Sequence, residues 1–128
     1  MLNRTTLVGR LVADPELRHT PSSQVPVARM TLAVDRSRPN SRGEKEADFF
    51  DIVAWRKLAE TCANYLKKGR LVSVDGRLRS RKWEKDGIKH KAVEVLAEEI
   101  SFLDRAKPDE QVRHVADGEP PLDDEVPF

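Results

Sequence analysis

A run of alternating arginines that ends in a tryptophan carries the strongest chemical signal in the chain. In GRLRSRKW, Arg77, Arg79 and Arg81 recur at every second position, and Lys82 and Trp83 follow. Residues two apart in a β-strand share a face, so three guanidiniums would repel one another unless an anion lies between them. Cations in this arrangement contact phosphates, and a neighbouring ring can stack on an unpaired base, worth about 1–3 kcal/mol per base. The pattern therefore indicates a single-stranded nucleic-acid surface, with a solvated charged face as the ordinary alternative.

A second aromatic pattern lies in DFFDIVAW. If this segment is a strand, Phe50 shares one face with Ile52 and Ala54, whereas Phe49 shares the other with Trp55. A barrel uses one of these faces for its core. The other face either packs on a helix or a second subunit, or meets a ligand, and both interpretations remain open at this point.

Basic residues also gather in two polar segments, RSRPNSRGEK and RKWEKDGIKHK, which read as hairpin connections able to wrap a flexible strand. Residues 1–104 hold 20 Lys/Arg and 15 Asp/Glu, a net charge of +5, whereas residues 105–128 hold 3 and 7, a net charge of −4. A basic body with an acidic tail is typical of nucleic-acid binding combined with an interaction tail.

The elements that must position these residues are mainly strands. Alternating apolar positions in VPVARMTLAVDR and DFFDIVAW predict two of them, a turn at Asp86-Gly87 predicts a hairpin, and Gly76 marks a bend or bulge. RKLAETCANYLKKGR predicts one helix, with Leu58 and Cys62 on its apolar face and Lys67, Lys68 and Gly69 at its end. Five strands with one helix between the third and fourth predict an all-β, five-stranded OB-fold barrel, followed from Arg105 by a disordered acidic tail. Other small β-barrels fit the same order of elements less well.

Composition excludes several classes of protein. No apolar run approaches the roughly 20 residues of a membrane span, and the N-terminus lacks the order of a signal peptide. The single cysteine, Cys62, makes no internal disulfide, so we expect a cytoplasmic protein, and one associated with the nucleoid if its basic face binds DNA. His19, His90 and His114 have no metal-ligand spacing and no glycine-rich phosphate loop is present. We expect no enzyme activity, no metal and no cofactor.

Five segments occur in one order in this chain: LVGRLVADPELRHT, VARMTLAV, KLAETCANYLKKG, VDGRLRSRKW and the final DDEVPF. In this the chain resembles the bacterial single-stranded DNA-binding proteins, most closely the low-GC Gram-positive type, over residues 1–104 and the last six. The resemblance implies an OB-fold DNA-binding and oligomerisation domain in residues 1–104, a flexible linker in 105–122 and a partner-binding tip in 123–128. It also implies a homotetramer that wraps single-stranded DNA during replication, repair and recombination.

The resemblance also assigns roles to individual residues, at the positions of this chain that match the family's motifs. The resemblance implies stacking by Phe49, Trp55 and Trp83, and it implies basic contacts from a larger set: Arg4, Arg38, Lys57, Lys67, Lys68, Arg79, Arg81 and Lys82. Arg38 stands where the family commonly has a stacking aromatic, and a guanidinium can also stack on a base. Phe50 stands where some relatives have a polar interface residue, and the linker is short for the family.

The final segment implies recruitment of replication, repair and recombination proteins. In the tip, Phe128 would fill an apolar pocket of a partner, and the acidic side chains would lie on its basic rim. The tip comprises Asp123, Asp124, Glu125, Val126, Pro127 and Phe128.

Three other functions remain as alternatives to single-stranded DNA binding. They are an RNA-binding OB module, a primosome adaptor whose DNA contact is secondary, and a nuclease, for which the chain lacks scaffolded carboxylates.

Overall fold

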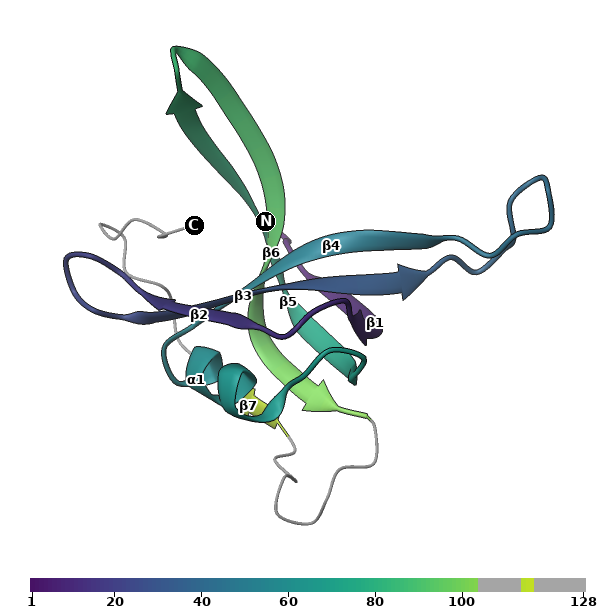
Figure 1. The fold of residues 1–128 in the computed structure, drawn as a ribbon, viewed down its shortest axis with the longest axis horizontal. Helices are drawn as coiled ribbons and strands as arrows, with labels where there is room; N and C mark the ends of the chain where they lie inside the picture. The colour runs from purple at the N-terminus through teal and green to yellow at the C-terminus, as the bar shows by residue number, and fades with distance from the viewer. Residues whose placement is uncertain (104–113, 117–128) are drawn as a thin grey trace.

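The computed structural model describes residues 1–103 and 114–116, and five of its strands close into a barrel (Figure 1). β1 (Thr5–Leu11) pairs antiparallel with both β3 (Pro26–Asp35) and β5 (Leu71–Lys85). β4 (Ala47–Trp55) pairs with β3, β6 (Ile88–Phe102) pairs with β5, and a parallel contact between β4 and β6 completes the ring. This closed order confirms the predicted five-stranded OB-fold barrel.

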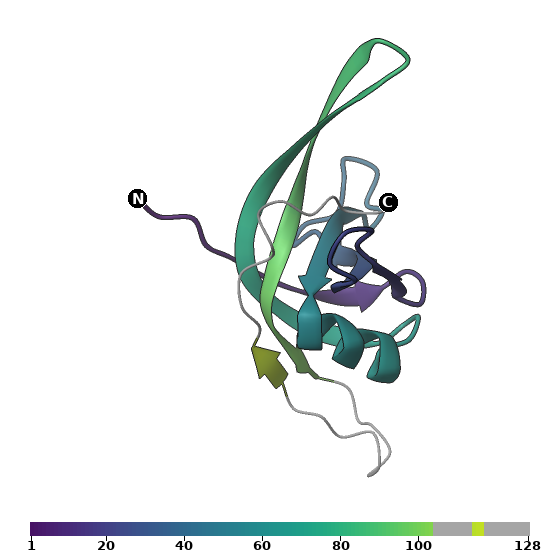
Figure 2. The ribbon, with the colours of Figure 1, turned by 90° about the vertical axis from the view of Figure 1, so that its left-hand side faces the viewer.

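A single helix in the described part of the chain, α1 (Arg56–Tyr65), lies between the third and fourth barrel strands, β4 and β5, as predicted. Leu58 and Cys62 on its apolar face are buried in the barrel core. Figures 1 and 2 both place α1 at the opposite end of the molecule from the tip of the β5–β6 hairpin. No helix in the described residues is long and apolar enough to cross a membrane.

The end of α1 differs from the prediction. Leu66 already has an extended backbone, with φ −97° and ψ 144°, and its N–H donates to the carbonyl oxygen of Cys62. The helix therefore stops before Lys67 and Lys68, which lie in the following turn rather than in a basic last turn. Gly69 follows with φ +89°, a conformation that glycine adopts without strain.

Two short strands were not predicted. β2 (Glu16–His19) follows the Asp14-Pro15 turn and pairs with β3, and β7 (His114–Ala116) pairs with β6 at the register Ile100–Val115. Strands of three or four residues give too little alternation to be recognised in a sequence. β7 falls within the segment predicted as a linker, residues 105–122; the rest of that segment, and the tip at 123–128, lie outside the described residues.

The two faces of β4 enter different clusters. Ile52 and Ala54 lie in the main core with residues of β3 such as Met30 and Leu32, which confirms the predicted alternation. Val53 and Trp55, on the opposite face, form a smaller cluster with Val27 and Leu96. The second face of β4 is therefore packed at Trp55.

Two predicted backbone features shape the long β5–β6 hairpin. The register between the strands shifts at Asp75–Gly76, which is the predicted bulge, and a Cβ at Gly76 would collide with the carbonyl oxygen of Leu96. The hairpin turns at Asp86 and Gly87, with φ +53° and +77°, the signature of a two-residue type I′ turn. Figures 1 and 2 show this hairpin projecting beyond the barrel, and Figure 1 shows the β3–β4 hairpin projecting in a second direction.

Candidate nucleic-acid interface

Strand register brings the arginine run and both tryptophans to one face, which we name the ladder face. Arg79 lies opposite Glu94, Arg81 opposite Ala92, and Trp83 opposite His90. The parallel contact of β4 with β6 at Val53–Leu96 adds Trp55 to this face. The ladder face comprises Val53 and Trp55 of β4, Arg77, Arg79, Arg81 and Trp83 of β5, and His90, Ala92, Glu94 and Leu96 of β6.

Each tryptophan of the ladder face has a guanidinium beside its ring. The guanidinium carbon of Arg79 lies 5.9 Å from the ring centroid of Trp55, and that of Arg81 lies 4.6 Å from the ring centroid of Trp83. On the hairpin, the rings of Trp83 and His90 stack with centroids 5.2 Å apart. Each ring thus has a cation beside it, which is the arrangement that binds a phosphate and its base together.

The three predicted stacking residues differ in accessibility. Phe49 is 66% exposed and Trp83 is 40% exposed, whereas Trp55 is only 2% exposed. Phe49 and Trp83 therefore offer ring surface to a base directly. Trp55 lies beneath Arg79, so its stacking role stays a prediction that requires Arg79 to move.

Glu94 is a part of the interface that sequence reasoning missed. It is buried, at 3% exposure, and its two carboxylate oxygens accept hydrogen bonds from Arg79 of β5, at 2.8 Å, and Arg29 of β3, at 2.9 Å. A buried carboxylate needs such partners, because an unpaired charge in the interior is costly. Its position in the otherwise apolar run AVEVLA was the available signal.

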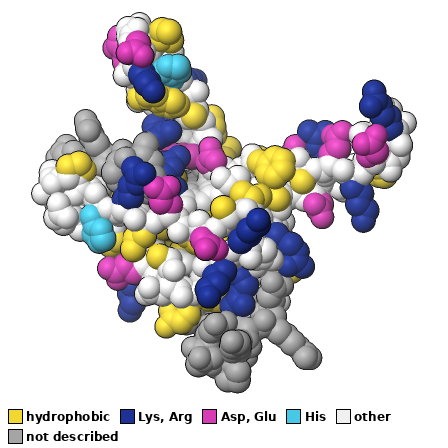
Figure 3. Space-filling model, viewed as in Figure 1, with side chains coloured by type: hydrophobic (Ala, Val, Ile, Leu, Met, Phe, Trp, Pro, Cys, Tyr) yellow, Lys and Arg dark blue, Asp and Glu magenta, His cyan; other side chains and the backbone are white. Residues whose placement is uncertain are grey.

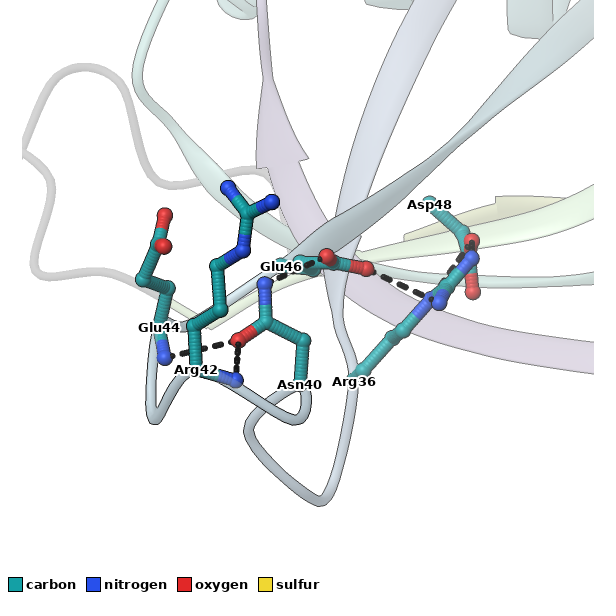
Figure 4. Close-up of polar contacts among 6 residues, drawn as sticks. All are labelled: Arg36, Asn40, Arg42, Glu44, Glu46 and Asp48. Carbon is teal, nitrogen blue, oxygen red and sulfur yellow. Dashed lines mark hydrogen bonds and ion pairs between the residues drawn. The ribbon is translucent and has the colours of Figure 1, made fainter.

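The β3–β4 connection is internally braced (Figure 4). Arg36 donates to Asp48 at 3.0 Å and to Glu46 at 3.0 Å, and the hydrogen bond to Asp48 is the main reason that its pKa is raised. Asn40 Oδ1 accepts from the backbone N–H groups of Arg42 and Glu44, at 2.9 Å each. Side-chain contacts of this kind define a loop that would otherwise be a long flexible connection.

Other cations of this loop are available to an external anion. Arg38, Arg42 and Lys45 are exposed and make no ion pair with any described residue. In Figure 3, Lys and Arg side chains mark both protruding hairpins, with Asp and Glu close by. The structure therefore places Arg38 on a projecting, braced loop, and its contact with DNA stays a prediction.

Arg4 is engaged within the chain. It lies at 2.8 Å from Asp75 and 2.5 Å from Glu98, and the hydrogen bond to Glu98 is the largest cause of its raised pKa. Arg77 also pairs with Glu98, at 3.4 Å. Because two carboxylates neutralise Arg4, a phosphate contact by this residue would have to compete with them.

Four predicted lysines lie away from the ladder face. Lys57 is on α1, and Lys67 and Lys68 are in the turn after it, at the end of the barrel far from the hairpin tip. Lys82 is paired in register with Lys91, so it points to the side of the hairpin opposite Trp83. All four are exposed, and they belong to one DNA site only if the strand wraps around the domain.

The described residues offer no evident reactive centre. Burial raises the pKa of the Cys62 thiol to about 12, so it stays protonated and packs as a small apolar side chain. Within residues 1–103 and 114–116, no group of His, Cys, Asp and Glu side chains could hold a metal ion.

Comparison with known proteins identifies the family. The model of the single-strand binding protein family matches residues 2–103. The chain is 56% identical over 105 residues to a single-stranded DNA-binding protein of Bacillus cereus, covering 81% of this chain and 61% of the relative. It is 53% identical to single-stranded DNA-binding protein 2 of Staphylococcus aureus, covering 81% and 74%. The match thus spans less than two thirds of the Bacillus relative. The chain belongs to the single-strand binding protein family.

Proposed function

We propose that this protein binds and coats single-stranded DNA without strong sequence preference, by base stacking and phosphate neutralisation. The observation that carries the proposal is the pairing of Arg79 with Trp55 and of Arg81 with Trp83 on one face of the barrel. Every base has a π-face, and every nucleotide has a phosphate, so such a surface needs no particular sequence. Both relatives are named single-stranded DNA-binding proteins, which supports this function, and we propose that the function is non-catalytic.

A titration of tryptophan fluorescence with oligo(dT), beside a duplex of equal length, tests the proposal. We expect quenching by the single strand alone, and weaker binding as salt rises, because bound phosphates release counterions. Arg81→Ala removes one phosphate contact and should reduce the slope of log affinity against log salt by about 0.7. Equal quenching by the duplex would contradict the proposal, and equal binding of oligo(U) would favour a general single-strand binder over a DNA-specific one.

A homotetramer belongs to the same proposal. Leu78 and Val93 are exposed on the side of the β5–β6 hairpin away from the ladder face, where a second copy of the chain could cover them. Analytical ultracentrifugation measures the mass of the assembly and so gives the oligomeric state directly. Val93→Lys should lower the mass of the assembly while the barrel stays folded, whereas an unchanged tetramer would place the interface elsewhere.

We also propose that the tip, residues 123–128, recruits replication, repair and recombination proteins. The chemistry that supports it is a cluster of carboxylates followed by Val126 and a terminal Phe128. A partner would need an apolar pocket with a basic rim. Deletion of residues 123–128 should abolish capture of such partners and leave oligo(dT) binding by the barrel in place; unchanged capture would contradict this role.

A further inference from the structure

Trp55 occupies a closed position in an otherwise open interface. Phe49, on the same strand, and Trp83, on the hairpin, both present ring surface to solvent. The ring of Trp55 is packed among Val27, Val53 and Leu96 at its sides, and the guanidinium of Arg79 lies over it, within the roughly 6 Å of a cation–π contact.

Arg79 is held in that place by Glu94. The two residues lie directly opposite each other on β5 and β6, and Arg79 Nη2 donates to Glu94 Oε1 at 2.8 Å. Arg29 occupies the other oxygen of the same carboxylate. The side chain of Arg79 is 29% exposed, against 16% for Arg29 and 2% for Glu94, so Arg79 is the member of the trio that an external anion reaches first.

The indole N–H of Trp55 is an unpaired donor. Its Nε1 is fully buried and has no hydrogen-bond acceptor among the described residues. Buried donors are nearly always paired in folded proteins, and an orphaned one calls for an explanation. An acceptor atom of a bound nucleotide would supply the partner.

We propose that Trp55 is a latent nucleotide subsite, closed by Arg79 and opened when a DNA phosphate replaces Glu94 as the anion partner of Arg79. A phosphate accepts two hydrogen bonds from a guanidinium, as a carboxylate does, so the exchange preserves the charge-assisted contact. Once Arg79 turns outward, the face of Trp55 is uncovered for a base, and its Nε1–H gains a nucleotide acceptor. Arg29 remains to neutralise Glu94. This subsite rests on the proposed function.

The chain provides its own reporters, because Trp55 and Trp83 are its two tryptophans. Trp83→Phe leaves Trp55 as the sole indole, and Trp55→Phe leaves Trp83. In rapid mixing with oligo(dT), we expect the quenching rate of Trp83 to rise steadily with DNA concentration. The quenching rate of Trp55 should instead reach a plateau, because the exchange of Arg79 from Glu94 to a phosphate is a first-order step that follows binding and precedes stacking.

Two substitutions in the Trp83→Phe background test the closure itself. Arg79→Ala removes the cover, so we expect the plateau to disappear and acrylamide quenching of Trp55 in the free protein to rise several-fold. Glu94→Gln keeps the shape of the side chain and weakens the hold on Arg79, so the plateau rate should rise several-fold. Glu60→Gln, on the exposed side of α1 and outside both the ladder face and the proposed interface between copies, is the matched control and should change neither quantity.

The outcomes separate this subsite from the general function. If Trp83 is not quenched by oligo(dT), the proposed function itself fails. If Trp83 is quenched and Trp55 is not, or if the two follow the same concentration dependence with Arg79 present, DNA binding stands and the latent subsite is wrong. Unchanged acrylamide access in Arg79→Ala would equally overturn it.

Discussion

Trp83 and His90 stack across the β5–β6 hairpin, with ring planes inclined by 16°. The contact joins paired residues of two strands and restricts the rotation of an exposed tryptophan at the place where we propose that a base binds. We expect His90→Ala to weaken oligo(dT) binding by about 0.5–1.5 kcal/mol, the worth of such an aromatic pair. Fluorescence anisotropy of a labelled oligonucleotide measures this loss of affinity. His90→Phe should restore affinity, and an equal loss in both variants would mean that stacking is not the cause.

Phe49 and Phe50 are sequence neighbours with opposite surroundings, so they form a matched pair. Phe49→Ala should cost about 1–3 kcal/mol of DNA binding and little stability, because its ring is exposed. Phe50 packs against the core, so Phe50→Ala should reduce the free energy of unfolding, by up to about 3 kcal/mol. Oligo(dT) titration and urea unfolding of both variants check the pair. Loss of stability in Phe49→Ala, with affinity unchanged, would contradict the assignment.

Gly76 and Gly87 illustrate two different physical reasons why a position requires glycine. At Gly76 an added Cβ meets the backbone oxygen of Leu96, which cannot move without opening the barrel. Gly76→Ala should therefore destabilise the fold by about 3 kcal/mol or more. Gly87 has φ +77° and nothing within 4 Å of an added Cβ, so Gly87→Ala should cost only about 1–2 kcal/mol from backbone strain. Thermal unfolding ranks the two, and the reverse order would contradict this account.

Asn40 organises the β3–β4 loop through its carbonyl oxygen. Asn40→Ala leaves the N–H groups of Arg42 and Glu44 without that acceptor, so the loop should open more often. We expect faster trypsin cleavage after Arg42 or Lys45 in the folded protein, with a melting temperature close to that of the parent. Asn40→Asp retains the acceptor but loses the hydrogen bond that Asn40 Nδ2 donates to Glu46 at 2.8 Å, so its cleavage rate should lie between those of the parent and Asn40→Ala. Equal cleavage of all three proteins would show that other contacts define the loop.

The thiol of Cys62 gives a prediction at high pH. Its pKa is raised from 9.0 to about 12 by burial, so the folded state keeps the proton that the unfolded state loses. The contribution of this thiol is full below about pH 9 and declines as pH rises from there toward 12, on the order of 1 kcal/mol per pH unit.

Comparison of the parent with Cys62→Ala isolates the contribution of this thiol from that of every other group in the protein. The free energy of unfolding should fall more steeply with pH in the parent. If the free energies of unfolding of the two proteins fall in parallel with pH, the pKa of the thiol is not raised in the folded state.

Local patterns explain what the sequence could predict. The alternation of Arg77 to Arg81, the turn at Asp86-Gly87 and the bulge at Gly76 all follow from spacing within one hairpin, so they were recognisable without any tertiary information. The position at which α1 ends could not be predicted from such a pattern, because Lys67 and Lys68 are favourable in a last helical turn and equally acceptable beyond it.

The burial of Trp55 could not be predicted in the same way. It depends on Leu96 of β6 and on Arg79 of β5, which lies over the ring and is held there by Glu94, and these residues meet because β4, β5 and β6 lie in one particular register. Sequence spacing indicates which residues share a face of one strand. It does not indicate which side chain of a neighbouring strand will cover them.

The closed ring of strands also has a consequence for synthesis of the protein. β1 leaves the ribosome before the other strands of the barrel, yet its partner β5 begins at Leu71, and β6, which connects β5 to β4, ends at Phe102. A nascent chain can form the β3–β4 hairpin early, but β1 waits with one edge unpaired until most of residues 1–103 have emerged. Such long-range pairing slows folding and leaves the exposed edge open to unwanted partners in the meantime.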